Sequence, residues 1–260
     1  MYIMRKIINK LKFKSKRVKI MNTLENKTVV IIGGSQGIGL DTAKEAIAKG
    51  ANVTIASRSN EKLEKAKAFL NGKVSTYQLD GSNEEEVKAF FDKFDAINHL
   101  VISSSGAYGG PIQELDLNMA KELFNSKLWV QMNAVKHAST KMGKGDSITL
   151  FSGIVSRKAV VGQMPYTGVG GAVESLGKML ALELAPTRVN VITPGFIHTT
   201  AWDAFMPEEQ QNEFFKGFAE TLPVKQIGVA KDVTKGVLFF MESDYVTGAV
   251  LDIDGGQKLV

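Results

Sequence analysis

A glycine-rich turn near the start of the chain limits the fold more than any other feature. Thr28–Ile32 has the β-branched, apolar composition of a buried strand, and the sequence Gly33-Gly34-Ser35-Gln36-Gly37-Ile38-Gly39 follows it and runs into helical spacing. Glycines let the backbone turn tightly and approach a ligand without a Cβ in the way, and the first N–H groups of a helix attract anions. Between a strand and a helix, such a turn predicts a phosphate-binding site; the alternative is tight strand-to-helix packing alone.

Short β-branched runs alternate with longer amphipathic stretches from Lys27 onward. The pattern predicts seven strands, at Thr28–Ile32, Asn52–Ala56, Val74–Leu79, His99–Ser103, Ser147–Phe151, Arg188–Ile192 and Ala249–Ile253. It predicts helices over Ile38–Ala48, Glu61–Leu70, Glu84–Phe94, Met119–Lys141 and Tyr166–Leu184, with Ser82 and Glu85 as a capping box for the third. This alternation is typical of an α/β fold, a doubly wound parallel sheet of Rossmann type with about seven strands and helices on both faces.

The stretch from Thr199 to Pro223 is longer than a plain crossover needs and is rich in aromatic residues. It carries Trp202, Phe205, Met206, Phe214, Phe215 and Phe218. We interpret residues 199–223 as a lid on a single nucleotide-binding domain that spans residues 27–260. Its aromatic side chains either favour an apolar or ring-containing substrate or form the packing face of two short helices.

The charge distribution and the residue counts limit the functions that the chain can have. Residues 1–20 hold eight of the 32 basic residues and no acidic one, so the rest of the chain carries 27 acidic against 24 basic residues and the net charge of +5 belongs to the tail. This argues against nucleic-acid binding by the folded domain. We expect residues 1–26 to be a disordered extension, or the start codon to be set too early with Met21 as the true beginning, in preference to membrane attachment. The chain lacks cysteine and has three scattered histidines, so we predict no metal site and no thiol chemistry. The absence of cysteine does not indicate a redox compartment, and we separately expect a cytoplasmic protein.

Several spaced motifs resemble those of the short-chain dehydrogenase/reductase family, in its short single-domain branch, from Lys27 to the C-terminus. The glycine turn matches T-G-x-x-x-G-x-G with Ile32 in place of threonine, Ser103-Ser104-Ser105-Gly106 stands where N-N-A-G is usual, and Asp254-Gly255-Gly256 matches the end of the final strand. The resemblance implies that Asp80 contacts the adenine and that Pro194, Gly195 and Thr199 lie beside the nicotinamide. The cofactor site expected on this basis comprises Gly33, Ser35, Gln36, Gly37, Ile38, Gly39, Ser57, Arg58, Asp80, Gly81, Ser104, Ser105, Gly106, Pro194, Gly195, Ile197 and Thr199.

The end of the second predicted strand indicates which dinucleotide binds. An acidic residue about 20 positions past the glycines would accept hydrogen bonds from the ribose of NAD. This chain has Ser57 followed by Arg58, so no carboxylate repels a 2′-phosphate and a guanidinium can pair with one. The alternative is an exposed arginine that merely precedes a helix. We expect NADP(H) in preference to NAD(H).

The catalytic pattern of the family is incomplete. The resemblance implies a proton-transferring tyrosine at Tyr166, but the lysine position four residues later is Gly170, the serine falls near Ser152, and Lys127 stands where an asparagine is expected. In one interpretation the ammonium of Lys127 enters the space that Gly170 leaves empty and acts as a relocated lysine. In the other, catalysis has decayed and Lys127 is a solvated helix charge.

Two functions follow from these expectations. The first is an NADP(H)-dependent oxidoreductase that interconverts a small-molecule carbonyl and an alcohol by hydride transfer, with Tyr166, Lys127 and Ser152 as catalytic residues. The second is a catalytically silent NADP(H)-binding sensor or scaffold, which Gly170 favours. The resemblance also implies a homo-oligomer, a dimer or a tetramer, that pairs the two long helices.

Overall fold

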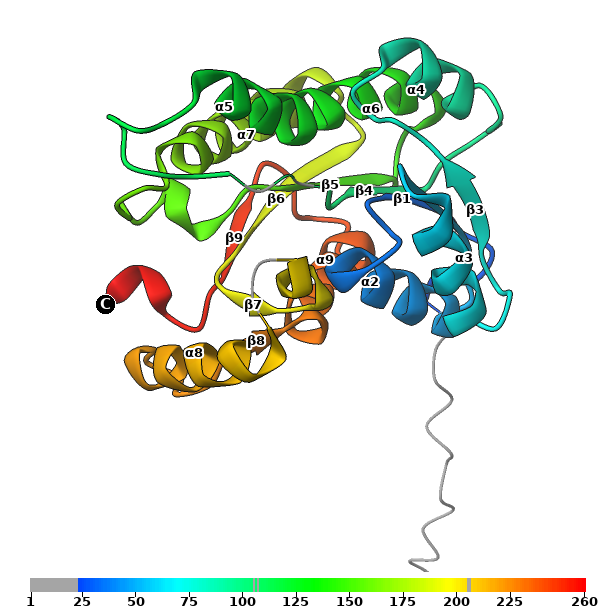
Figure 1. Ribbon diagram of the computed structural model, residues 1–260. Coiled ribbons are helices and arrows are strands. Elements are labelled where there is room, and N and C mark those ends of the chain that lie inside the picture. The colour runs from blue at the N-terminus through cyan, green and yellow to red at the C-terminus, as the bar shows by residue number, and fades with distance from the viewer. Residues whose placement is uncertain (1–22, 105, 107, 205–206) are drawn as a thin grey trace, which may run out of the picture.

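The computed structural model describes residues 23–260 apart from 105, 107, 205 and 206. Seven parallel strands form one sheet, in the spatial order β3 (Ser75–Gln78), β2 (Asn52–Ser57), β1 (Thr28–Ile32), β4 (His99–Ile102), β5 (Ser147–Phe151), β6 (Arg188–Pro194) and β9 (Val250–Ile253). Helices cover both faces of the sheet (Figure 1). The predicted doubly wound, Rossmann-type sheet is therefore confirmed.

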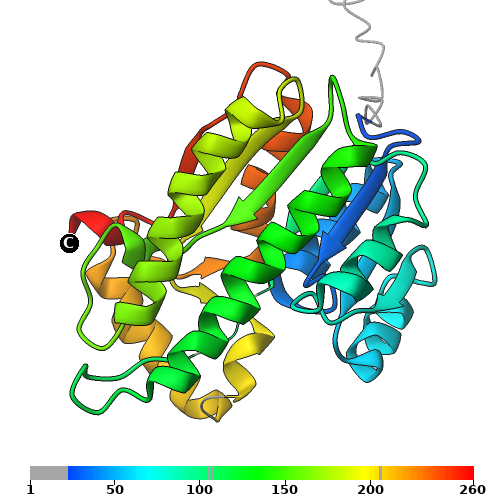
Figure 2. The same cartoon turned by 90° about the horizontal axis from the view of Figure 1, so that it is seen from above.

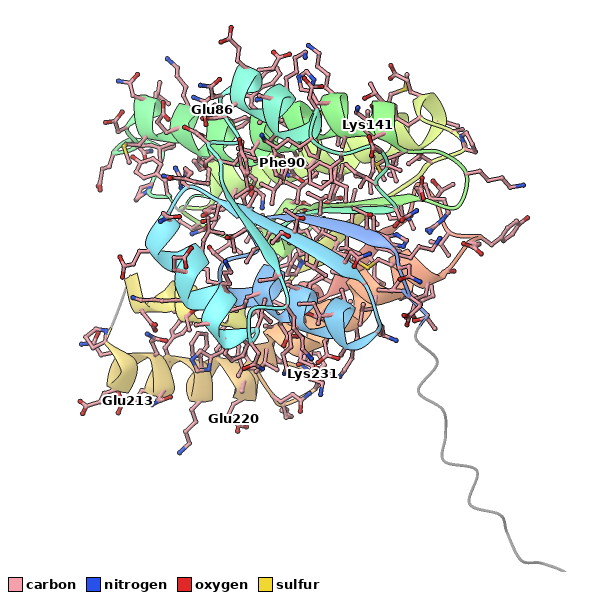
Figure 3. The ribbon with its side chains drawn as sticks, turned by 90° about the vertical axis from the view of Figure 1, so that its right-hand side faces the viewer. Glu86, Phe90, Lys141, Glu213, Glu220 and Lys231 are labelled. Atoms are coloured by element: carbon pink, nitrogen blue, oxygen red, sulfur yellow. The ribbon has the colours of Figure 1, made fainter. Side chains whose placement is uncertain are left out.

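Alternate residues of the central strands enter two separate cores. In β1, Val29 and Ile31 belong to the core shared with α2 (Gly37–Ala48), α3 (Asn60–Phe69) and α9 (Ala230–Glu242). Val30 and Ile32 belong to the opposite core, shared with α4 (Glu84–Phe91), α6 (Val130–Ala138) and α7 (Met164–Glu183). Figure 3 shows Phe90 of α4 in this second core, where it is 1% exposed. Because both faces of the strands are covered, the sheet requires the uninterrupted apolar runs seen in the sequence.

The helix predicted over Met119–Lys141 has a more complex form. It consists of α5 (Leu117–Phe124), a π-helical turn η1 (Asn125–Trp129), α6 and a 3₁₀ turn η2 (Ser139–Lys141). A π turn inserts an extra residue into the α-helical repeat and so changes the face on which later residues lie. The helix α7 runs beside this composite helix (Figure 2). Within the described part of the chain, no helix combines the length and the apolar character needed to span a membrane.

Two local predictions are wrong. Leu24, which the sequence places in the extension, is 1% exposed and packs in the core beneath α2, so the folded part begins before residue 27. Residues 1–22 of that predicted extension lie outside the described residues. Helix α4 is capped by Asn83, whose side-chain oxygen accepts hydrogen bonds from the main-chain N–H groups of Glu85 and Glu86, whereas the Ser82 hydroxyl donates to Asp80.

The segment 199–223, here called the lid segment, comprises a 3₁₀ turn η4 (Thr200–Ala204) and α8 (Glu208–Thr221). It lies between the two short paired strands β7 (Ile197–His198) and β8 (Gly228–Val229). Its aromatic rings pack on one another and on Phe196, with centroid distances of 4.8 Å for Phe196–Phe218 and 5.3 Å for Trp202–Phe215. Of the two interpretations of these aromatics, the structure supports internal packing. Phe205 and Met206 lie outside the described residues.

Candidate active site

The glycine turn lies at the carboxyl end of β1, next to β4, where the strand order reverses. This switch point is where open α/β sheets bind ligands. Gly33 and Gly37 have φ angles of +86° and +56°, in the left-handed region that favours glycine. A Cβ on Gly33 would lie 2.6 Å from the main-chain nitrogen of Ser104, and one on Gly39 would lie 2.3 Å from the oxygen of Gly33. The turn therefore accepts only glycine at these close approaches.

A cleft of about 350 Å³ opens from this turn and runs to the start of α3. Most of the cofactor residues predicted from the sequence line it, namely Gly33, Ser35, Gln36, Gly37, Ile38, Gly39, Ser57, Arg58, Asp80, Gly81, Ser104 and Thr199. Of the other predicted residues, Gly106, Pro194, Gly195 and Ile197 lie outside this lining, and Ser105 is outside the described residues. The structure thus brings together residues that are up to 166 positions apart, Gly33 and Thr199.

Two observations indicate that the cleft can bind a dinucleotide. The glycine turn lines the cleft at the point where α2 begins, and the first N–H groups of a helix attract anions. The hydroxyl of Ser104 is buried and has no hydrogen-bond partner among the described residues, although it lines the cleft. A buried polar atom without a partner is costly, so a polar ligand group at this position would satisfy it.

Hydroxyl and basic groups gather at the far end of the cleft, after β2. The Ser35 hydroxyl donates to the Ser57 hydroxyl at 3.0 Å, and the Ser59 N–H donates to the same oxygen at 3.3 Å. Arg58 and Lys62 both line the cleft here. Lys62 was missed from the sequence, although it follows Arg58 by only four residues and stands in the first turn of the predicted helix.

Asp80 lines the same end of the cleft. Its carboxylate accepts hydrogen bonds from the Ser82 hydroxyl at 2.7 Å and from the Ser82 N–H at 3.0 Å. The Ser82 hydroxyl bond is the main cause that lowers the pKa of Asp80, and the nearby charge of Arg58 lowers it further. Asp80 is therefore a fixed acceptor.

Tyr166 stands in the first turn of α7, directly after Pro165. Its hydroxyl donates to the main-chain oxygen of Gly106 at 2.5 Å, and the Gly106 N–H donates to the Ser126 hydroxyl at 3.1 Å. Ser126 lines the cleft, so the predicted proton-transfer group is connected to the cleft wall through Gly106. The sequence analysis did not single out Ser126.

The space at Gly170 is filled. A Cβ there would lie 2.8 Å from the Ser152 hydroxyl and 3.0 Å from Cβ of Ser156. The Ser152 hydroxyl is within hydrogen-bond distance of the Gly170 main-chain oxygen (3.0 Å) and of a Glu174 carboxylate oxygen (2.9 Å). Ser152 is 3% exposed and its hydroxyl faces α7. The expectation that Gly170 leaves an empty space is therefore wrong, because two serines occupy it.

Lys127 lies in the π turn and points into the protein. Its ammonium donates to the main-chain oxygen of Ser152 at 2.9 Å, and Lys127 is only 5% exposed. Burial lowers the pKa of Lys127 to about 8. The side chain of Gln131 holds this arrangement, because its amide donates to the main-chain oxygens of Lys127 and Phe151. Lys127 is therefore not a solvated helix charge.

The carboxylate of Glu174 is a further group that the sequence analysis missed. It accepts a hydrogen bond from the Ser156 hydroxyl, and it pairs with Arg157 at 3.1 Å. Arg157 also pairs with Asp252 of β9 at 3.1 Å. Glu174 follows Gly170 by four residues and Tyr166 by eight, so helical periodicity alone places the three on one side of α7.

A parallel sheet with a glycine-lined cleft at its switch point defines a Rossmann-type dinucleotide-binding protein. A family model described as Enoyl-(Acyl carrier protein) reductase matches residues 33–258. A short-chain dehydrogenase/reductase from Acremonium sp, ucsE, is 31% identical over 258 residues, which cover 91% of this chain and 97% of that protein. The 3-oxoacyl-[acyl-carrier-protein] reductase of Mus musculus is 29% identical over 242 residues, which cover 90% and 99%.

Solved structures are similar over the same range. A small-chain dehydrogenase in complex with NADPH has a TM-score of 0.80 and 32% identity, over 91% of this chain and 100% of that chain. MalC Reductase/Diels-Alderase from Malbranchea aurantiaca has a TM-score of 0.85 and 25% identity, over 93% and 99%. This chain belongs to the short-chain dehydrogenase/reductase family and is an NAD(P)-dependent oxidoreductase.

Proposed function

We propose that this protein is an NADP(H)-dependent oxidoreductase that interconverts a small-molecule carbonyl and an alcohol. The observation that carries the cofactor preference is the pair Arg58 and Lys62, which lines one end of the cleft beside the Ser57 hydroxyl. A 2′-phosphate there would meet two cations and hydroxyl donors. The NADPH complex of the similar small-chain dehydrogenase agrees with this preference.

Each wall of the cleft has a task in this proposal. The glycine turn binds the pyrophosphate with its main-chain N–H groups, and Asp80 with Gly81 borders the adenine. Thr199 borders the nicotinamide, and Pro194, Gly195 and Ile197, which lie outside the cleft lining, belong to the segment that leads to Thr199. The bound cofactor supplies or accepts a hydride. Tyr166 exchanges a proton with the oxygen of the carbonyl or alcohol through its hydroxyl, which rests on Gly106 until substrate replaces that contact.

Lys127 and Ser152 act behind Tyr166 in this proposal. The Lys127 ammonium holds the main-chain oxygen of Ser152, at the point where β5 ends and the loop toward Tyr166 begins. The Ser152 hydroxyl holds α7 through Gly170 and Glu174. Both are positioning residues, and Lys127 adds a positive charge on the Tyr166 side of the sheet.

A titration and a turnover assay test the proposal together. We expect NADPH to bind more tightly than NADH, and NADPH to be oxidised in the presence of some member of a broad panel of aldehydes and ketones. Equal affinity for the two cofactors would contradict the NADP(H) preference. Binding without turnover on any carbonyl or alcohol would select the second candidate, a silent NADP(H)-binding sensor or scaffold, which the glycine at position 170 favours.

We further propose that the protein forms a homo-oligomer. Large apolar side chains are exposed along the two long helices, including Leu117, Met119 and Trp129 on the composite helix and Met179 and Leu182 on α7, where Leu182 is 78% exposed. Exposed apolar side chains of this size on neighbouring helices suit a symmetric contact. Light scattering coupled to gel filtration gives the mass, and Leu182→Glu should shift it toward the monomer.

A further inference from the structure

The end of the chain contacts both ends of the lid segment. The side-chain oxygen of Gln257 accepts a hydrogen bond from the Phe196 N–H at 2.9 Å, just before the lid segment begins. The Val224 N–H donates to the Gly255 oxygen at 3.4 Å, just after it ends. Residues 254–257, here called the C-terminal turn, follow β9 and are drawn in red in Figure 1. One short turn therefore holds the chain at its entry to the lid segment and at its exit.

The contact at the entry is close and buried. Gln257 is 3% exposed. A Cβ on Gly195 would lie 2.8 Å from the Gln257 side-chain oxygen and 2.8 Å from Cα of Asp254, and the Gly195 N–H donates to the Ile253 oxygen at 3.0 Å. The segment from Pro194 to Ile197 thus lies directly on the C-terminal turn.

The same residue also contacts the loop that precedes Tyr166. The ammonium of Lys158 donates to the main-chain oxygen of Gln257 at 3.2 Å and to the oxygen of Val260. Gln257 therefore has two acceptors in use: its side-chain oxygen binds the segment that leads to Thr199, and its main-chain oxygen binds the loop that leads to Tyr166. These are the two sides of the proposed reaction site.

The lid ends have room to move if this contact is lost. A hollow of about 120 Å³ lies beside it, lined in part by Phe196, Ile197, Val224 and Gly255. Three residues beyond Phe196, the Thr199 side chain lines the cofactor cleft, and a Cβ on Gly37 would lie 3.6 Å from Cβ of Thr199. A shift of Phe196 would therefore reach the glycine turn through Thr199.

We propose that Gln257 is a positioning residue of the enzyme, which holds Phe196 through its side-chain oxygen and thereby sets both the resting position of the lid segment and the approach of Thr199 to the cofactor cleft. The link to catalysis rests on the proposed function, whereas the effect on the lid segment does not. Without the acceptor, the Phe196 N–H would be left without its partner beside a hollow, which favours opening.

Two substitutions at one position test the proposal. Gln257→Met keeps the length of the side chain and removes the acceptor, whereas Gln257→Glu keeps an oxygen acceptor for the Phe196 N–H. Leu259→Ala is the control, because Leu259 is 75% exposed in the 3₁₀ turn η5 (Gln257–Leu259) that begins at Gln257. We expect amide hydrogen exchange in α8 (Glu208–Thr221) to be about fivefold faster in the methionine variant, and near the parental rate in the glutamate and control variants. Exchange in β5 should stay unchanged.

The NADPH dissociation constant is the second measurement. We expect it to rise about fivefold in Gln257→Met and to be restored in Gln257→Glu. Parental exchange in α8 of the methionine variant, or an equal acceleration in β5, would overturn the proposal. Faster exchange in α8 with unchanged NADPH affinity would overturn the link to the cleft. If the parental protein fails to bind NADPH, the proposed function is wrong, and the exchange comparison still decides whether Gln257 holds the lid segment.

Discussion

The buried ammonium of Lys127 donates a hydrogen bond of 2.9 Å to the main-chain oxygen of Ser152. The bond joins the π turn of the composite helix to the end of β5, through two residues that are 25 positions apart in the sequence. Removing an ammonium from water is unfavourable, and a hydrogen bond to one neutral carbonyl offsets that only in part. An apolar side chain would serve stability better at this position, which supports the role proposed for Lys127 in the site.

Burial of Lys127 should make stability depend on pH. Its pKa falls from 10.5 to about 8 on folding. Between these values the unfolded chain binds the proton and the folded protein does not, so the free energy of unfolding should rise with pH across this window, by about 3 kcal/mol in total. Urea denaturation of the parent and of Lys127→Met between pH 7.5 and 10.5 checks this, and the methionine variant should lack this part of the slope. Parallel curves for the two proteins would contradict it.

Activity should depend on Lys127 and Tyr166 as a unit. We expect Tyr166→Phe and Lys127→Ala each to reduce kcat by about 100-fold or more, because each disables a proton-transfer group or its support. The double variant should be far from additive. Steady-state kinetics on any substrate found to turn over provide the measurement. A fully active Lys127→Ala would mean that Tyr166 works with water or substrate groups instead.

Gly170 and its neighbour Gly171 offer a matched pair. Gly170→Ala should lower the free energy of unfolding by about 1–3 kcal/mol, because the new Cβ meets Ser152 and Ser156. Gly171→Ala should raise it by about 0.5–1 kcal/mol, because a Cβ there meets no atom within 4 Å and alanine is the better helix former. Because Ser152 and Ser156 already fill the space at position 170, Gly170→Lys should not restore the activity of Lys127→Ala. Equal stability of the two alanine variants would show that the serines move aside.

Arg58 should contribute selectively to NADPH affinity. Arg58→Ala should weaken NADPH binding by about 1.5–3 kcal/mol, as expected for a charge-assisted hydrogen bond, and leave NADH binding nearly unchanged. Lys62→Ala should act in the same direction. Lys65→Ala serves as the control, because Lys65 lies in α3 like Lys62 but its ammonium pairs with Glu61. Equal losses for both cofactors would place the guanidinium away from the 2′-phosphate.

Leu24 should stabilise the fold although it precedes the first strand. Leu24→Ala should lower the free energy of unfolding by about 2–4 kcal/mol, because its side chain is 1% exposed in the core beneath α2. Phe69→Ala, at a residue 61% exposed, should change it by less than about 0.5 kcal/mol. Thermal or chemical denaturation compares the two. A Leu24→Ala variant as stable as the parent would indicate that residues 23–26 do not belong to the core.

The strands could be predicted closely because their signal is local. The predicted and observed limits coincide for Thr28–Ile32 and Ser147–Phe151, which are buried on both faces. Strand β6 continues beyond Ile192 to Pro194 because it pairs with β9 as far as Ile253, a contact that the sequence of β6 does not reveal. The π turn was missed because a helical repeat averaged over several turns hides one inserted residue.

The candidate site shows the same difference between features that depend on neighbouring residues and features that depend on distant ones. The glycine turn and the pair Ser57 and Arg58, which line the cleft, could be predicted because neighbouring residues carry the chemistry. Glu174 and Gln257 were missed because their partners, Ser152 and Phe196, are 22 and 61 residues away. No sequence spacing predicts that the Gly170 position would be filled from another loop, since the two serines reach it only after β5 packs against α7.

The cleft lies at the carboxyl ends of the parallel strands, so the turn that precedes β5 lies at their amino ends, on the opposite side of the molecule. Lys144 in that turn is exposed, and neither Gly143 nor Gly145 has a neighbouring atom within 4 Å of an added Cβ. Because the chain has no cysteine, Lys144→Cys would introduce its sole thiol. Maleimide coupling at that thiol would fix every molecule to a bead or electrode in one orientation, with the cofactor entrance facing the solution.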